Sequence, residues 1–232
     1  MDYRPDLRLG AIAITVGAVA VCGFRLAHGD LPAADAPAAL RFIAHHPFYA
    51  GVHLGTIAGV LLWAGGVVAL TGTLSDPLAV LSGRLARAAT LIGAAIFITD
   101  FTIDGVTGQD LAHTYANAAP ADQAGLELVA HTAFAILRGT SLTSIIILWG
   151  VTLILLGYAL GRDGYAGWLG WSAVAIGALT AVAAGALLFQ PTLFPGALLY
   201  GALVSIVVQL WSIALGATMW RRSRVAHSAI ES

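Results

Sequence analysis

The sequence predicts an all-α protein, a polytopic transmembrane bundle of about six helices. Hydrophobic residues make up 59% of the 232 residues and charged residues only 10%, and the mean hydropathy is +0.86. Because a soluble domain carries about 25% charged residues, lipid must be the solvent for most of this surface. The apolar residues also form continuous runs of roughly 20, the helical length that crosses a hydrocarbon core.

Six such runs follow one another along the chain, and they are rich in Ala, Leu, Val, Ile and Gly. A transmembrane barrel would need short segments that alternate apolar and polar residues, so the runs predict helices. We expect one transmembrane domain over 1–232 and no second domain. The expected spans are 9–26, 51–72, 85–106, 139–161, 165–189 and 195–220. The first run is long for a signal peptide and ends at Arg25, so we expect it to be kept as a span.

The arginines predict the orientation of the bundle, since all 11 basic residues are arginines. Three of them, Arg25, Arg41 and Arg138, fall on one side of the expected membrane. The other eight fall on the side that holds both termini: Arg4, Arg8, Arg84, Arg87, Arg162, Arg221, Arg222 and Arg224. Because basic loops stay in the cytoplasm, we expect both termini to be cytoplasmic.

Two segments are expected outside the membrane, at about 27–50 and 105–138. A helix that starts near Asp122 and runs to Gly161 would be about 60 Å long, twice the thickness of the hydrocarbon core. Residues 122–138 must therefore project outward, lie along the interface or bend near Gly139. This predicts an outer amphipathic segment before span four.

Composition excludes several classes of function. Without a lysine, the chain cannot form a retinal or pyridoxal Schiff base. The one cysteine, Cys22, cannot form an internal disulfide, a CxxC pair or a multi-cysteine metal site. A net charge of −1 gives no basic field for nucleic acid, so the expected partner is the lipid bilayer. The sequence defines neither a cofactor nor an oligomeric state.

Carboxylates inside the membrane are the strongest functional signal. Asp100 and Asp104 are four residues apart on span three, so they should share a face of the helix in its outer part. A charge inside a bilayer costs about 2.5–3.5 kcal/mol on insertion scales, so it is retained when it is paired, solvated or used. The pair predicts a site for a cation, a proton or a polar ligand, or an ion pair with Arg25 or Arg138.

A second signal is a polar stripe on the outer segment. Glu127, His131, Phe134 and Arg138 recur at helical spacing. His131 would have a proton or metal role with Glu127 orienting it, or the stripe is the polar face of an interfacial helix. His53, at the outer start of span two, is either a haem or zinc ligand or an interfacial histidine. No HExxH, ExxH or HxxxH spacing occurs among the histidines, so no metal site is predicted.

These side chains gather on the outer side of the expected topology. We predict that they line one outward-opening cavity in which Asp100, Asp104 and His131 are the catalytic candidates. The full set of candidate ligand-binding residues is Asp100, Asp104, Glu127, His131, Arg138, His53 and Arg25.

The leading function is binding of a small or lipid-like molecule in that cavity, with apolar walls for its body and the charged groups for its head. A membrane-embedded enzyme is the alternative, with acid–base or metal-assisted chemistry on a lipid or isoprenoid. A third class is electron transfer through b-type haem with His53 and His131 as axial ligands. Proton-coupled transport is disfavoured, because the chain has neither repeated halves nor a midplane site.

Three stretches carry a resemblance to known proteins. They are Asp104-Gly105 at the end of span three, Ala116–Asp122 with Pro120, and Gly164–Trp171 entering span five. With these stretches the chain resembles a largely uncharacterised group of six-span integral membrane proteins from high-GC bacteria. The resemblance covers most of the chain. It implies the six-span fold and a bacterial inner (cell) membrane, and it implies no activity.

Overall fold

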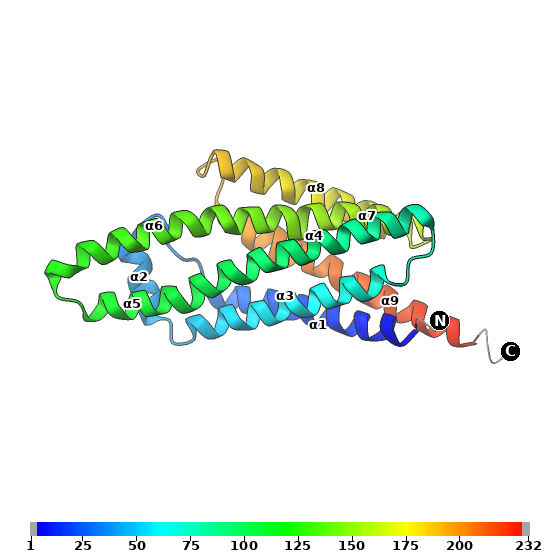
Figure 1. Cartoon of the computed structure of the whole chain (residues 1–232), viewed down its shortest axis with the longest axis horizontal. Coiled ribbons are helices and arrows are strands. Elements are labelled where there is room, and N and C mark those ends of the chain that lie inside the picture. The colour runs from blue at the N-terminus through cyan, green and yellow to red at the C-terminus, as the bar shows by residue number, and fades with distance from the viewer. Residues whose placement is uncertain (1–3, 229–232) are drawn as a thin grey trace.

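The computed structural model describes residues 4–228 and confirms an all-α bundle, since every regular element in that part of the chain is a helix. The first helix, α1 (Arg4–His28), begins and the last, α9 (Gln209–Ser228), ends at the same end of the bundle (Figure 1), which we call the terminal end; the opposite end is the hairpin end. Six helical units are long and apolar enough to cross a membrane: Asp6–His28, Tyr49–Thr71, Pro77–Asn117, Pro120–Arg162, Gly167–Phe189 and Leu198–Arg224.

Close helix packing builds the core of the bundle. Helix α1 (Arg4–His28) packs against α3 (Tyr49–Thr71) and α9 (Gln209–Ser228), and α4 (Pro77–Thr102) joins α3 to α7 (Thr152–Arg162). Helix α8 (Gly167–Phe189) covers α7. In the centre, the rings of Trp63 and Trp149 meet edge to face at 4.6 Å. The Trp63 indole N–H donates to Ser212 of α9 at 2.8 Å. Helix α3, the π-helical turn that holds Trp149 and helix α9 therefore share one core.

Two helical units are much longer than the expected spans. A π-helical turn, η1 (Ile103–Thr107), joins α4 to α5 (Gly108–Asn117) in one unit of 41 residues. Likewise η2 (Ile146–Val151) joins α6 (Pro120–Ile145) to α7 in a unit of 43 residues. At 1.5 Å per residue both units are roughly 60–65 Å long. Both units therefore contain the expected spans 85–106 and 139–161 and extend well beyond them.

Capping explains why helix α4 begins at Pro77. The Asp76 carboxylate accepts hydrogen bonds from the backbone N–H groups of Leu78 and Ala79, and Pro77 takes the first helical position. Both features start a helix in polar surroundings, before the apolar run begins. Arg84 and Arg87 consequently lie on exposed faces of α4 rather than in a loop.

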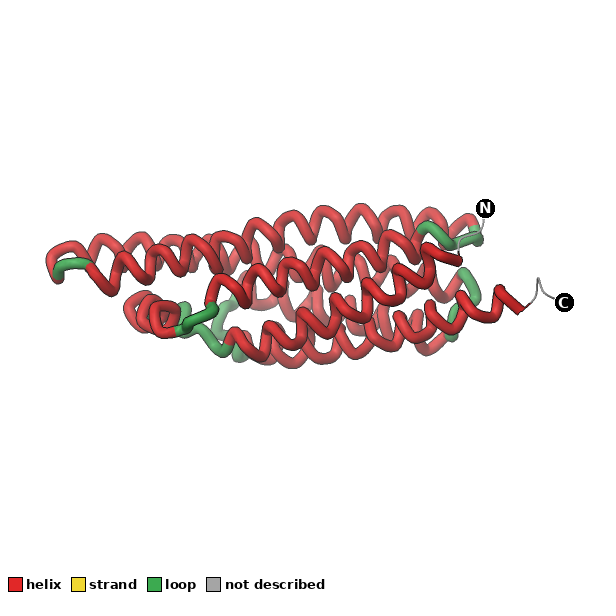
Figure 2. The backbone as a smooth tube through the Cα atoms, turned by 90° about the horizontal axis from the view of Figure 1, so that it is seen from below, coloured by secondary structure: helices red, strands yellow, loops and turns green. Residues whose placement is uncertain are grey.

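The hairpin end carries a helical extension. The chain stays helical through Gly139, so of the three arrangements expected for 122–138 the outward projection is the one found. Helix α5 and the first half of α6 extend side by side beyond the other spans (Figure 1). Short helix α2 (Ala36–His45) lies across the bundle there and is seen nearly end-on in Figure 2. It fills the space between α5 and α6 with a second small core.

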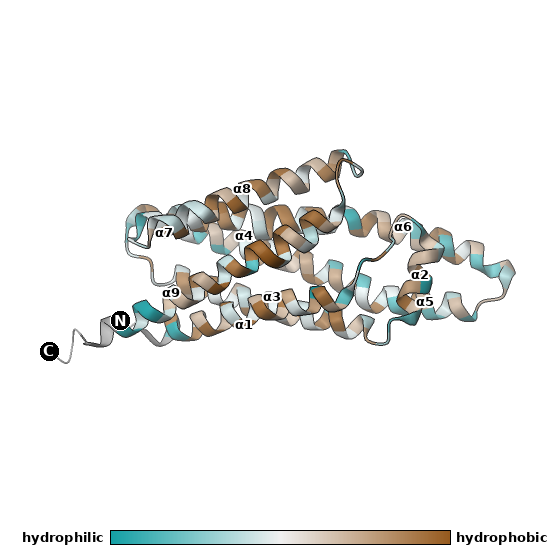
Figure 3. Cartoon of the chain, turned by 180° about the vertical axis from the view of Figure 1, so that it is seen from behind, coloured by the Kyte–Doolittle hydropathy of each residue, from teal (hydrophilic) through white to brown (hydrophobic). Residues whose placement is uncertain are grey.

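The polar residues gather at the two ends and the middle is apolar (Figure 3). The sixth span begins with a long π-helical segment, η3 (Leu198–Val208), and continues into α9. By their positions along these helices, the eight arginines expected on the side of the termini are at the terminal end. Arg25, Arg41 and Arg138 are at the hairpin end.

Candidate metal centre

Three potential metal ligands from distant parts of the sequence meet at the hairpin end. His28 is the last residue of α1, His53 lies in the second turn of α3, and Asp104 lies in the π-helical turn η1. One ligand atom from each residue lies within 4.8 Å of the other two. We call these three residues the HHD cluster.

His53 is held in one orientation. Its ring is 1% exposed, and Nδ1 lies 2.8 Å from the backbone carbonyl of Tyr49. Because a carbonyl can only accept, Nδ1 carries a proton, and in the neutral ring Nε2 then has a free lone pair. That Nε2 faces a carboxylate oxygen of Asp104 at 3.1 Å. Two acceptors at this distance need a cation between them, either a proton on Nε2 or a metal ion.

His28 has the same tautomer by the same reasoning. Its Nδ1 lies 2.9 Å from the carbonyl oxygen of Gly29 and donates to it, so Nε2 is the atom available to a metal. The ring lies 4.8 Å from the His53 ring and at a steep angle of 65° to it. Unlike His53, His28 is partly exposed, which places it at the entrance of the cluster.

Asp104 is oriented by Tyr49. One carboxylate oxygen accepts from the Tyr49 hydroxyl at 2.9 Å, and the other faces His53. Tyr49 is fully buried and thus orients two members of the cluster, His53 through its carbonyl and Asp104 through its hydroxyl. The ring of Phe101 packs on His53 at 5.2 Å and adds an apolar wall. Metal-binding histidines and carboxylates characteristically have such outer partners.

Two imidazoles and one carboxylate form a ligand set suited to Zn²⁺ or Fe²⁺. Ligands on a tetrahedral Zn²⁺ are about 3.3 Å apart, as follows from bonds of about 2.0–2.1 Å. The 3.1 Å between His53 and Asp104 is close to that value. Three protein ligands leave a position for water or a substrate, as in catalytic rather than structural zinc sites.

Only two of the seven residues predicted from sequence meet in the cluster, namely His53 and Asp104. Asp100 lies one turn deeper, is 4% exposed, and accepts a hydrogen bond from the Thr140 hydroxyl of α6. Asp100 and Asp104 thus bond to different neighbouring helices.

The other four predicted residues have separate surroundings. Glu127 accepts from the Tyr115 hydroxyl at 2.8 Å, which links α6 to α5. Arg25 pairs with Asp30 at 2.7 Å, rather than with either aspartate of α4. His131 and Arg138 are exposed on α6.

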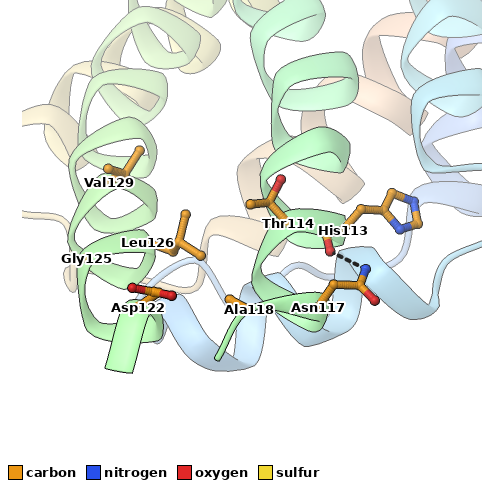
Figure 4. A pocket seen from close by; sticks show the side chains of 8 residues that line it. All are labelled: His113, Thr114, Asn117, Ala118, Asp122, Gly125, Leu126 and Val129. Atoms are coloured by element: carbon orange, nitrogen blue, oxygen red, sulfur yellow. Dashed lines mark hydrogen bonds between the residues drawn. The ribbon is translucent and has the colours of Figure 1, made fainter. Parts of the chain in front are cut away.

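The cavities at the hairpin end involve other residues. One, of about 740 Å³, opens between α5 and α6 near the tip of the extension, where Leu126 and Asp122 face Thr114 and Asn117 (Figure 4). A second, of about 480 Å³, lies beside α2 and is lined by Arg41, Phe42 and His46 among others. None of the seven predicted residues lines either cavity.

Fold and site together define a class: a polytopic all-α membrane protein with a partly buried histidine–carboxylate centre at one end of its bundle. Comparison with protein-family models, curated proteins and solved structures finds no match for this chain.

Proposed function

We propose that the protein is an integral membrane metalloprotein that binds one divalent transition-metal ion, Zn²⁺ or Fe²⁺, through His28, His53 and Asp104. The observation that carries the proposal is the pair of acceptors 3.1 Å apart, His53 Nε2 and the Asp104 carboxylate, with the His28 ring beside them. Each ligand is oriented through its remaining polar atom.

The charge of the hairpin end supports a cationic ligand. By position it carries seven carboxylates and only three arginines. A surface of one sign raises the local concentration of ions of the opposite sign. The seven carboxylates are Asp30, Asp35, Asp100, Asp104, Asp110, Asp122 and Glu127.

An open position on a partly buried metal is where water or the polar head of a small or lipid-like molecule would bind. The proposal thereby joins ligand binding at this end of the bundle with metal-assisted chemistry. It is favoured over a haem held by His53 and His131, because His53 is already directed at Asp104 and His131 is exposed. We also propose that the hairpin end faces outward from a bacterial inner membrane, in keeping with the distribution of arginines.

The test is metal content of the full-length protein in detergent, stripped with a chelator and reloaded with Zn²⁺ or, without oxygen, Fe²⁺. Elemental analysis after gel filtration should give one metal per chain. His53→Ala and Asp104→Asn should each reduce metal content to less than a tenth. His131→Ala, which changes an exposed histidine outside the cluster, should leave it unchanged.

Two results would overturn the proposal: wild type without bound metal after reloading, or His53→Ala and Asp104→Asn with wild-type metal content. If these substitutions prevent folding, His28→Ala tests the same site from the partly exposed end of α1, and wild-type metal content in His28→Ala would then overturn the proposal. A haem would be recognised independently by a Soret band in the purified protein.

A further inference from the structure

The end of α1 holds His28, one of the two partly exposed members of the HHD cluster. The Arg25 guanidinium donates to the Gly29 carbonyl at 2.8 Å through one nitrogen and to Asp30 at 2.7 Å through another. The same Gly29 carbonyl accepts the Nδ1 proton of His28 at 2.9 Å. Arg25 therefore holds the acceptor that orients His28.

The backbone here has little freedom to place that carbonyl elsewhere. Gly29 has φ +71°, a left-handed conformation that glycine adopts readily and that commonly ends a helix. A side chain on Gly29 would also lie 3.3 Å from the Phe42 ring of α2. The turn after α1 is thus shaped by Arg25 on one side and α2 on the other.

We infer that Arg25 is a positioning residue for the metal centre, which orients His28 through the Gly29 carbonyl. The inference rests on the proposed function. Its chemistry is the outer-partner effect: a hydrogen bond to the distal nitrogen of a histidine ligand sets the ring orientation, and its loss typically weakens metal binding 10- to 100-fold. The ion pair between Arg25 and Asp30 contributes less to holding this turn, since the Asp30 side chain is 76% exposed.

Arg25 could affect metal binding through its positive charge or by positioning His28. The two roles predict opposite changes in metal affinity when Arg25 is replaced, so one affinity measurement distinguishes them. If Arg25 acted only as a nearby positive charge, Arg25→Gln would remove repulsion and tighten binding of a divalent cation. If Arg25 positions His28, the same substitution loosens the ring and weakens binding. Arg41→Gln, at an exposed position of α2, removes an equal charge from the same end of the bundle and is the matched control.

The experiment is titration of the chelator-stripped, full-length protein in detergent with Zn²⁺, with Co²⁺ absorption as a probe of ligand geometry. We expect Arg25→Gln to raise the Zn²⁺ Kd by up to about 10-fold, the lower end of the loss typical of a direct outer partner, because the Gly29 carbonyl itself remains. It should also change the Co²⁺ spectrum. Arg41→Gln should leave both unchanged or tighten binding slightly. Arg25→Lys, which keeps the positive charge and a long side chain that ends in N–H donors, should restore part of the affinity.

An unchanged or lower Kd in Arg25→Gln would overturn the inference while the metal site itself stands. A wild type that binds no Zn²⁺ would instead overturn the proposed function. If Arg25→Gln does not fold, Gly29→Ala tests the same carbonyl, because alanine is strained at φ +71°. Wild-type Zn²⁺ affinity in Gly29→Ala would then count against the inference.

Discussion

Gly105 lies directly against the HHD cluster. A Cβ at this position would fall 2.7 Å from Cγ of the His53 ring, a distance that forces one of the two to move. Gly105→Ala should therefore displace His53 and weaken Zn²⁺ binding about 10- to 100-fold, as other changes around metal ligands do. The measurement is the same Zn²⁺ titration. Gly125→Ala is the matched control, since nothing lies within 4 Å of its added methyl group, and equal affinities in the two variants would contradict the prediction.

Thr140 provides the hydrogen bond that Asp100 receives inside the bundle. Thr140→Val keeps the shape of the side chain and removes the donor, so the buried carboxyl group loses a partner. Such a loss costs about 1–3 kcal/mol, and we expect a lower thermal unfolding midpoint in detergent. Thr132→Val is the control, because its exposed hydroxyl donates to the Leu128 carbonyl of its own helix. A Thr140→Val midpoint at or above that of the control would argue against this role.

At the scale of helices, the contact between α1 and α3 depends on backbone approach. A Cβ on Gly66 would lie 2.6 Å from Cβ of Ile14 and 2.9 Å from the Gly10 carbonyl oxygen. Since backbone cannot move aside cheaply, Gly66→Ala should destabilise the bundle by about 1–3 kcal/mol. The neighbouring Gly65 has open space around it, so Gly65→Ala should be near neutral. Thermal unfolding of the two variants side by side checks this, and equal midpoints would refute it.

The N-terminus of α4 gives the protein a pH-dependent element of stability. The backbone N–H of Ala79, and then the side chain of Arg162, hold the pKa of the Asp76 carboxyl below its ordinary value. A folded pKa below the unfolded one stabilises the fold above the unfolded pKa, and this stabilisation disappears as pH falls through the folded pKa. Asp76→Ala should therefore lower the unfolding midpoint at pH 7, with a difference from wild type that shrinks below about pH 4.

Asp110→Ala is the control for this prediction, because no hydrogen bond of the Asp110 side chain is found among residues 4–228. Its unfolding midpoint at pH 7 should stay close to that of the wild type. A constant difference between wild type and Asp76→Ala from pH 7 to pH 3 would contradict the assignment.

Helix limits show how far sequence reasoning reaches at this scale. Hydropathy predicts the six spans because only apolar side chains can face the lipid without a large cost in free energy. It does not predict the helix ends at Pro77 and Asn117, which depend on caps and on packing against α2. The Asp76-Pro77 pair could have marked the first of these ends, since aspartate before proline is a strong start signal for a helix.

For the molecule as a whole, the site was harder to predict than the fold. His28, His53 and Asp104 lie on three helices and share no local spacing, so a search for metal motifs could not find them. Asp104 and His53 were predicted because an ionisable side chain placed in or next to lipid costs free energy and is therefore a candidate for a functional role. Tyr49 carries no charge and so gives no such signal, and His28 falls in the expected external segment 27–50 rather than in a span. Only the packing of α1, α3 and η1 shows that both belong to the centre.

The orientation of the whole bundle can be tested with single cysteines in a Cys22→Ala background, which has no other thiol. Ala121→Cys would lie near the tip of the hairpin end and Arg224→Cys at the terminal end, and both positions are exposed. The arginine distribution predicts that a membrane-impermeant thiol reagent labels Ala121→Cys in intact cells and labels Arg224→Cys only after lysis. The reverse pattern would place the metal centre on the cytoplasmic side, where it would draw on the cell's buffered metal pool rather than on the ions outside.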